Sequence, residues 1–344
     1  MGQYKLRSCV WEITLKCSFS CRYCGSKGGK ARENELTTEE CRSVAGQLRD
    51  MGCRRVSLIG GEVFMRGDWD RIVRFLTDGG IRTAIITNGW LFTDRTLGLL
   101  KELGVESVAV SADGPEDVHD KYRQEGSWKR AEKAMDKLIG NGVVTTVIST
   151  LNAENALRLE ETYGWLRTKG IAAWQIQACS PMGNAALSGV PYRFDTGRVI
   201  RFVEARRESA PFPMGIADNI GYFTETEGSL RGNPSGKAVF PGCSAGLTGI
   251  GIDSAGNVRG CESMYDDRFI EGNLREKTLK EIWESPDAFA YNRKFTKDML
   301  TGACAECEKG PWCAGGCRSY NYFVHGKLYE SPLCARARQT MSAE

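Results

Sequence analysis

Residues 17–24 read Cys17-Ser18-Phe19-Ser20-Cys21-Arg22-Tyr23-Cys24 and directly follow a β-branched run, Val10–Leu15, that predicts the first strand. Three thiolates on one loop can bind three irons of a four-iron, four-sulfur cube and leave the fourth iron without a protein ligand. A structural zinc site is the alternative, but zinc takes four closed ligands, and the nearest other cysteine, Cys9, lies within the strand. The spacing therefore favours an iron–sulfur cluster with one open iron, bound by Cys17, Cys21 and Cys24.

Outward from this loop, residues 9 to about 178 alternate short β-branched runs with amphipathic helical stretches. This alternation is typical of parallel strands joined by crossover helices. The six expected strands are Val10–Leu15, Arg55–Ile59, Thr83–Thr87, Ser107–Ser111, Val143–Thr150 and Ala173–Gln177. Six β/α units are too few for a closed eight-stranded barrel. We therefore expect an α/β fold, a partial (β/α)6 barrel with its active site at the carboxyl ends of the strands.

Composition places the chain among ordinary globular proteins. Of its 344 residues, 41% are hydrophobic and 26% are charged. The 46 Lys and Arg against 43 Asp and Glu leave a net charge of +3, too small to predict a nucleic acid, a membrane surface or an acidic substrate as partner. No apolar run approaches the ~20 residues of a membrane span, and the N-terminus lacks a signal-peptide core. We expect a cytoplasmic protein.

The histidine and cysteine counts narrow the chemistry. Neither of the two histidines, His119 and His325, lies in an H-E-x-x-H pattern, and no G-x-x-x-x-G-K-[ST] loop is present, which rules out a zinc hydrolase of that type and a P-loop nucleotide hydrolase. Fourteen cysteines in so long a chain are below the density of a disulfide scaffold. In a reducing compartment they indicate bound metal.

The loop at residues 17–24, with the aromatic Tyr23 before its third cysteine, resembles the cluster loop of the radical S-adenosylmethionine (SAM) superfamily. The resemblance implies that SAM chelates the open iron through its amino and carboxylate groups. One-electron reduction then cleaves SAM to a 5′-deoxyadenosyl radical, which abstracts hydrogen from the substrate.

Two strand ends resemble further motifs of this superfamily. Gly60-Gly61-Glu62 matches a G-G-E-P motif with Val63 in place of proline, and Ser111-Ala112-Asp113-Gly114 matches an S-x-D-G segment near the SAM ribose and carboxylate. A strand end and a solvated arginine are the alternative for the second segment and Arg123. The SAM contacts implied are Tyr23, Gly60, Gly61, Glu62, Ser111, Asp113 and Arg123.

Seven further cysteines cluster toward the C-terminus. Their spacing resembles the SPASM domain of many radical SAM enzymes, and two zinc knuckles are the alternative. The resemblance implies one fully ligated distal cluster and one proximal cluster with three cysteines, giving three [4Fe-4S] clusters in all. The distal ligands would be Cys304, Cys307, Cys313 and Cys334, and the proximal ones Cys243, Cys261 and Cys317. The proximal cluster then has an open site, takes a ligand other than cysteine, or receives the substrate.

Two other residues are candidates for catalysis. Cys179 follows the sixth strand, where a thiol could donate a hydrogen atom to a substrate radical, with packing as the alternative. Glu262 follows Cys261 and is a candidate base near the proximal cluster, with a surface position as the alternative. Cys9, Cys41 and Cys53 are expected to be buried and without a role.

The chain divides into three parts in this interpretation. Residues 1–180 form the radical SAM partial barrel, residues 181–240 form a connector interrupted by prolines, and residues 241–344 form the SPASM domain. The sequence starts almost directly at the first strand, so we expect leader-peptide recognition to be done elsewhere or by another chain.

The resemblance implies an enzyme that acts on a peptide or protein, by cross-linking, oxidising or epimerising a ribosomal precursor. Formylglycine formation in a sulfatase and small-molecule or cofactor biosynthesis are the alternative enzyme functions, and an iron–sulfur electron carrier is the non-enzyme alternative. Expected partners are the substrate, a flavodoxin- or ferredoxin-type electron donor and a separate leader-binding protein. A nucleic acid and a membrane are not expected.

Overall fold

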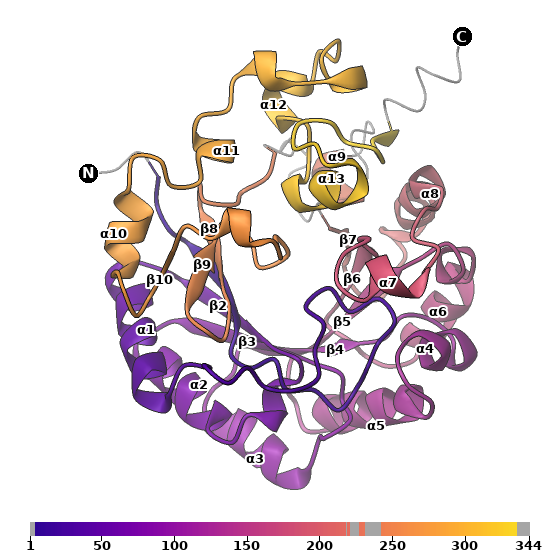
Figure 1. The fold of residues 1–344 in the computed structure, drawn as a ribbon. Helices are drawn as coiled ribbons and strands as arrows, with labels where there is room; N and C mark the ends of the chain where they lie inside the picture. The colour runs from indigo at the N-terminus through magenta and orange to yellow at the C-terminus, as the bar shows by residue number, and fades with distance from the viewer. Residues whose placement is uncertain (1–3, 218, 221–226, 231–241, 336–344) are drawn as a thin grey trace.

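The computed structural model describes residues 4–217, 219–220, 227–230 and 242–335. Within these residues a ten-stranded sheet curves into an open barrel with helices on its outer side (Figure 1). The strands are β1 (Ser8–Glu12), β2 (Arg55–Ile59), β3 (Arg82–Thr87), β4 (Ser107–Ser111), β5 (Thr145–Leu151), β6 (Ala173–Ala178), β7 (Met214–Ile216), β8 (Gly249–Ile252), β9 (Asn257–Arg259) and β10 (Gly272–Asn273).

Strands β1 to β7 lie side by side in chain order, and each is parallel to the next. Strand β8 joins the other side of β1, also in parallel, with Gly249 opposite Ser8. Antiparallel β9 and β10 extend the sheet beyond it. The predicted α/β partial barrel is confirmed, and its six predicted strands are β1 to β6, although β1 begins at Ser8 rather than Val10. The sheet also continues across the expected domain boundaries at residues 180 and 240.

The helices bury one face each against the sheet or against each other. Helix α1 begins with a capping box, in which the Thr37 hydroxyl accepts from the Glu40 N–H and the Glu40 carboxylate accepts from the Thr37 N–H. The helices are α1 (Thr38–Asp50), α2 (Trp69–Asp78), α3 (Asp94–Glu102), α4 (Glu116–Tyr122), α5 (Ser127–Gly140), α6 (Leu159–Leu166), α7 (Ala185–Ser188), α8 (Thr196–Arg206), α9 (Glu227–Leu230), α10 (Leu279–Glu284), α11 (Ala290–Arg293), α12 (Gly310–Cys313) and α13 (Arg318–His325). No helix in the described ranges is long and apolar enough to cross a membrane.

The two faces of the strands differ in side-chain size. In β4, Val108 and Val110 are fully buried, while the alternate residues Ser107, Ala109 and Ser111 line the inside of the barrel. Closed β/α barrels fill their interior with branched aliphatic side chains. Here the inner face of β4 carries small residues instead, and the barrel encloses a cavity.

The C-terminal part contains short helices held together by buried polar contacts. Arg318 is fully buried at the start of α13, and its Nη1 donates to the carbonyl oxygens of Ala314, Gly316 and Leu328. Asn321 Nδ2 donates to Leu328 O as well, at 3.0 Å. These bonds connect the segment that carries Cys313 and Cys317 to the segment that leads to Cys334.

Candidate functional site

A cavity of about 1020 Å³ occupies the interior of the barrel. Its walls include inward-facing residues of β1 to β7, such as Val10 of β1 and Gly215 of β7. Two sets of cysteines line this same cavity: Cys17, Cys21 and Cys24 from the loop after β1, and Cys243, Cys261 and Cys317 from the C-terminal part. The fold thus brings residues more than 200 positions apart to one space.

The three thiols of the first loop lie close enough to interact electrostatically. Burial, with smaller contributions from the neighbouring Cys24 and Cys17, raises the pKa of Cys21 to about 12 against the lowering effect of Arg123. Buried thiols of this kind become thiolates only when a bound cation compensates their charge. Among the described residues no three His, Cys, Asp or Glu side chains gather tightly enough to hold a single metal ion. Three thiols on one loop are a donor set that can bind three irons of a four-iron cluster.

The backbone around these thiols is held by the segment that follows β6. Asn184 N–H donates to Cys24 O at 2.8 Å, and its side-chain Nδ2 donates to Cys21 O at 3.0 Å. On the next turn, the Ser188 hydroxyl donates to Arg22 O at 2.6 Å. A segment that the sequence places in the connector therefore positions the cysteine loop.

The glycines of the Gly60-Gly61-Glu62 motif are required by the backbone beside them. Gly61 N–H donates to Thr14 O at 2.8 Å. A Cβ on Gly60 would lie 2.6 Å from Thr14 O, and one on Gly61 would collide with the carbonyl oxygens of Leu15 and Lys16. The motif thus packs directly on the chain that enters the cysteine loop.

Glu62 is a buried carboxylate in the cavity wall. It accepts hydrogen bonds from Thr87 Oγ1 and Asn88 N–H, both at 2.8 Å, and from Phe64 N–H at 3.3 Å. Burial raises the pKa of Glu62, and no Lys or Arg of the described chain forms an ion pair with it. A cationic group in the cavity would supply the missing counter-charge, so this position fits the ammonium group of SAM.

Asp113 lies behind the cavity wall, whereas Ser111 and Arg123 line the cavity. Tyr23 OH and Arg123 Nε both donate to Asp113 Oδ2, and Thr150 N–H donates to Oδ1 at 2.7 Å. Although burial opposes it, the Arg123 guanidinium lowers the pKa of Asp113. Asp113 therefore acts on the cavity by holding Arg123 and Tyr23 in place.

His119, to which the sequence assigns no role, supports the position of Asp113. Its Nδ1 accepts a hydrogen bond from Asp113 N–H at 3.2 Å. Burial lowers the pKa of His119 to about 4, with a smaller contribution from Arg123, so the ring is neutral near pH 7. No local sequence signal marks this contact, because it depends on the turn between β4 and α4.

The seven C-terminal cysteines fall into two sets. Burial raises the pKa of Cys261, and Glu262, Cys243 and Cys317 raise it further. Burial raises the pKa of Cys313 to about 12, with further contributions from the other three cysteines of its set, Cys304, Cys334 and Cys307. The sets of three and four match the division that the SPASM resemblance implies. Their role as cluster ligands stays a prediction.

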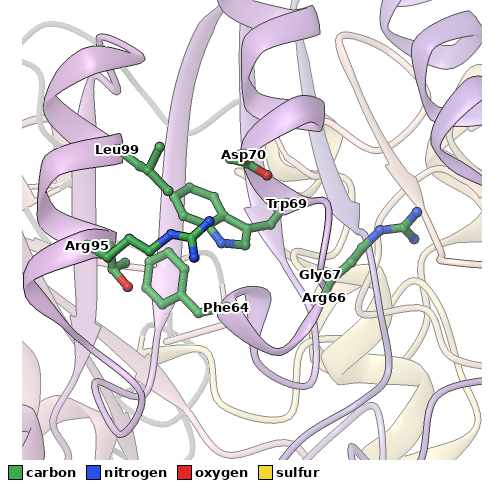
Figure 2. Close-up of a pocket in the computed structure, with 8 residues that line it drawn as sticks. Phe64, Arg66, Gly67, Trp69, Asp70, Arg95 and Leu99 are labelled. Atoms are coloured by element: carbon green, nitrogen blue, oxygen red, sulfur yellow. The ribbon is translucent and has the colours of Figure 1, made fainter.

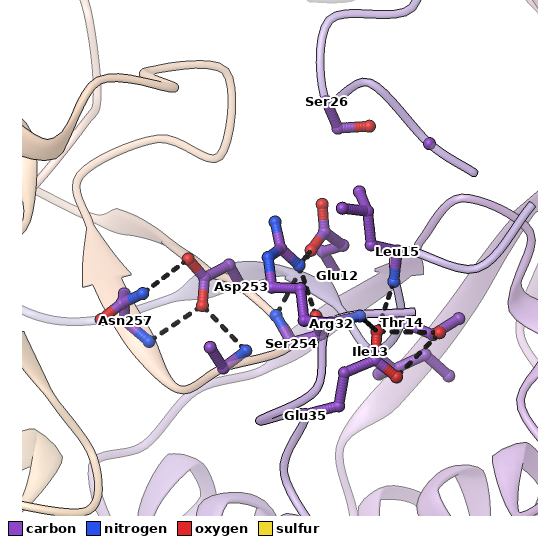
Figure 3. A network of polar contacts seen from close by, with 12 residues as sticks. Glu12, Ile13, Thr14, Leu15, Ser26, Arg32, Glu35, Asp253, Ser254 and Asn257 are labelled. Atoms are coloured by element: carbon purple, nitrogen blue, oxygen red, sulfur yellow. Dashed lines mark hydrogen bonds and ion pairs between the residues drawn. The ribbon is translucent and has the colours of Figure 1, made fainter. Parts of the chain in front are cut away.

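A polar network connects the end of β1 and the segment after the first cysteine loop with the C-terminal part of the chain (Figure 3). The Glu12 carboxylate at the end of β1 accepts from Arg32 Nη1, Tyr265 OH and Ser254 N–H. Glu35, three residues after Arg32, accepts from Leu15 N–H at 2.7 Å. The network contains groups from β1, from the segment after the cysteine loop and from the C-terminal part, so it fixes these three relative to one another.

The two catalytic candidates both line the cavity. Burial raises the pKa of Cys179 to about 12, and the thiol packs among apolar side chains near Tyr23 and Tyr122. Glu262 is half-buried and accepts from Ser263 Oγ at 2.8 Å and from the Cys261 thiol, with 3.5 Å between Oε2 and Sγ. Cys9, Cys41 and Cys53 are buried, as predicted.

A second, smaller cavity of about 200 Å³ contains none of the predicted site residues (Figure 2). The rings of Phe64 and Trp69, in edge-to-face contact at 5.0 Å, form its apolar side, and Arg95 extends over them. It lies between α2 and α3, on the helical side of the sheet. The SAM contacts that line a cavity, and both catalytic candidates, are in the larger one.

The family models agree with the two cysteine regions. Residues 11–166 match the model of the radical SAM superfamily, and residues 243–308 match the model of SPASM, an iron–sulfur cluster-binding domain. Each match begins close to the first cysteines of the corresponding set.

Curated relatives of several kinds resemble the chain along most of its length, among them an Fe-coproporphyrin III synthase of Methanosarcina barkeri, 27% identical over 94% of this chain and 86% of that protein. The chain is 28% identical to an AdoMet-dependent heme synthase of Methanosarcina barkeri, over 95% of this chain and 96% of that protein. It is 27% identical to the mycofactocin maturase MftC of Mycolicibacterium smegmatis, over 92% of this chain and 79% of that protein.

Among solved structures, Streptococcus suis SuiB bound to S-adenosylmethionine has a TM-score of 0.78 at 17% identity, covering 96% of this chain and 78% of that chain. SuiB bound to its precursor peptide SuiA has a TM-score of 0.77 at 18% identity, covering 96% and 76%. The likeness shows a shared fold.

Proposed function

Since the chain belongs to the radical SAM superfamily and carries a SPASM domain, we propose that it cleaves SAM reductively and takes a hydrogen atom from a peptide or protein substrate. The observation that carries this proposal is the single cavity, lined both by the Cys17–Cys24 loop and by the proximal cysteines. When bound, the cluster on the first loop supplies the electron that cleaves SAM to methionine and a 5′-deoxyadenosyl radical.

The residues of the chain would divide the binding of these groups as follows. Cys17, Cys21 and Cys24 would hold the SAM cluster, and the seven C-terminal cysteines would hold two auxiliary [4Fe-4S] clusters. Glu62 would pair with the SAM ammonium, and Arg123, oriented by Asp113 and Tyr23, would contact its negatively charged groups. Ser111 and the backbone of Gly60 and Gly61 complete the proposed contacts.

Two relatives support a peptide substrate. The mycofactocin maturase MftC resembles nearly the whole chain in sequence, and SuiB, solved with a precursor peptide, resembles nearly the whole chain in fold. We propose cross-linking, oxidation or epimerisation as the outcome. A flavodoxin- or ferredoxin-type protein would supply electrons, and a separate protein would bind a leader peptide.

Small-molecule chemistry on an iron porphyrin is the second candidate, favoured by the heme synthase relatives. Porphyrin propionates need cationic partners in a binding site. Of the two arginines among the described cavity residues, Arg55 pairs with Glu106 at 2.9 Å, and Arg123, which pairs with Asp113, is the residue already proposed to contact SAM. This charge arrangement favours the peptide.

The test compares both substrate classes with one enzyme preparation. Anaerobically reconstituted protein, SAM and a strong reductant are incubated with short peptides encoded beside the gene, and separately with iron coproporphyrin III. Mass spectrometry follows 5′-deoxyadenosine, loss of two hydrogens from a peptide, and deuterium uptake from heavy water. The Cys24→Ala variant is the control without SAM cleavage. Conversion of the porphyrin with no change in any peptide would contradict the proposal, and no deoxyadenosine from cluster-loaded wild-type protein would favour an electron carrier.

A further inference from the structure

Glu262 holds a fixed place on the cavity wall. A Cβ on Gly251 would collide with the backbone N of Glu262, so the glycine lets this backbone lie directly against β8. Strand β8 is in turn paired with β1, through Gly251 opposite Val10. The Glu262 carboxylate is therefore presented from a rigid part of the sheet into the space that the Cys17–Cys24 loop also lines.

The other charged side chains in the cavity either form ion pairs or already have a proposed role in binding SAM. Arg55 and Arg123 pair with Glu106 and Asp113, and Glu62 faces the proposed SAM site. Among the described residues, Glu262 accepts only from the Ser263 hydroxyl and the Cys261 thiol, and none of their cations pairs with it. Within this part of the chain, Glu262 is therefore the cavity carboxylate with neither a counter-charge nor an assigned partner.

The surroundings of Glu262 make the need for a cation stronger. A cluster held by Cys261 would turn the neighbouring thiol into a thiolate, which removes one of the two hydrogen bonds that Glu262 accepts and adds negative charge. A substrate that fills the cavity would also displace water from the carboxylate. Burying an uncompensated carboxylate raises the free energy of the complex. A substrate cation close to the carboxylate offsets this desolvation penalty, so substrates that carry such a cation bind more tightly than those without one.

We propose that Glu262 is a specificity-determining residue, which binds the side chain of a lysine or arginine of the substrate within the cavity. This inference rests on the proposed peptide substrate and narrows it to a peptide with a basic residue close to the modified position. It also separates Glu262 from a general base, because binding a cation requires its charge rather than its ability to take a proton from carbon.

The experiment measures which peptides the enzyme retains. Immobilised, cluster-loaded enzyme with SAM is incubated with a library of random seven-residue peptides, acetylated at the N-terminus so that side chains supply the only cations. Retained peptides are sequenced for wild type, Glu262→Gln and Glu262→Lys. Glu276→Lys makes the same change of net charge at an exposed position outside the cavity and serves as the matched control. Iron content checks that each variant is intact.

Wild type and Glu276→Lys should retain Lys- and Arg-containing peptides about tenfold over Asp- and Glu-containing ones. Glu262→Gln should abolish this preference, and Glu262→Lys should reverse it. Should the Lys variant lose iron, the Gln variant alone decides. Peptides retained by wild type without a charge preference, or a preference that the Gln variant keeps, would overturn the role of Glu262 while leaving peptide chemistry intact. If no peptide is retained and none is modified, the proposed function fails with it.

Discussion

At the scale of single residues, the cavity depends on side chains that lie behind its wall. Asp113 orients Arg123 and Tyr23, and neutral His119 accepts the Asp113 N–H. A protonated His119 could no longer accept that hydrogen bond, so the arrangement of His119, Asp113, Arg123 and Tyr23 is sensitive to pH.

His119 should make stability depend on pH below neutrality. Its pKa is about 4 in the folded chain, below the ordinary 6.5, so the unfolded chain binds more protons between these values. Stability conferred by the neutral ring is complete above pH 6.5 and falls toward pH 4, by up to about 1 kcal/mol per pH unit. Denaturant unfolding at pH 7.0 and 5.5 should show a smaller loss for His119→Gln than for wild type. An equal loss in both would contradict the assignment.

Cys179 should matter for the product and not for SAM cleavage. Its raised pKa keeps it as a neutral thiol, the form that has a hydrogen atom to donate to a substrate radical. Cys179→Ala should still yield 5′-deoxyadenosine but release a different peptide product, seen by mass spectrometry. An unchanged product would return Cys179 to a packing role.

At the scale of elements, the cysteine loop is shaped by segments distant in sequence. The turn before α7 holds it through Asn184, and the Gly60-Gly61-Glu62 turn packs against its entry. The loop geometry is therefore not a property of residues 17–24 alone.

Removing the Asn184 side chain should loosen the first cluster. Asn184→Ala keeps the backbone bond to Cys24 O but loses the bond to Cys21 O, worth about 1 kcal/mol, which corresponds to about fivefold faster loss of iron to a chelator. Asn141→Ala, which removes a similar side-chain bond to Lys137 O on exposed α5, should leave the rate unchanged. Equal rates for both variants would show that the contact does not hold the loop.

At the scale of the whole molecule, ten cysteines form three sets in one chain, in groups of three, three and four. If each set holds a four-iron cluster, reconstituted protein contains about twelve irons. Replacing Cys17, Cys21 and Cys24 by Ala should leave about eight, measured by iron and sulfide analysis. Stoichiometric zinc in anaerobically prepared protein would contradict the cluster assignment.

The sequence allowed the fold to be predicted where signals are local. Strand β4 was predicted at Ser107–Ser111 because its β-branched run is short and bounded. Three-residue β7 was missed because it is short and follows Pro211 and Pro213 directly. The contacts of Asn184 depend on packing between segments about 160 residues apart, and the side-chain direction of Asp113 depends on the turn after β4. No local sequence pattern encodes either feature.

The pairing of β1 with β8 has a consequence for synthesis. The first strand leaves the ribosome early, yet one of its two neighbours is encoded about 240 residues later. At roughly 5–20 residues per second, translation takes on the order of 10–50 s to supply β8. During that interval one edge of β1 carries unpaired N–H and C=O groups beside cysteines that bind metal readily. We therefore expect chaperones to protect the nascent chain until its last strands emerge, so that expression at lower temperature with added chaperones should raise the yield of intact protein.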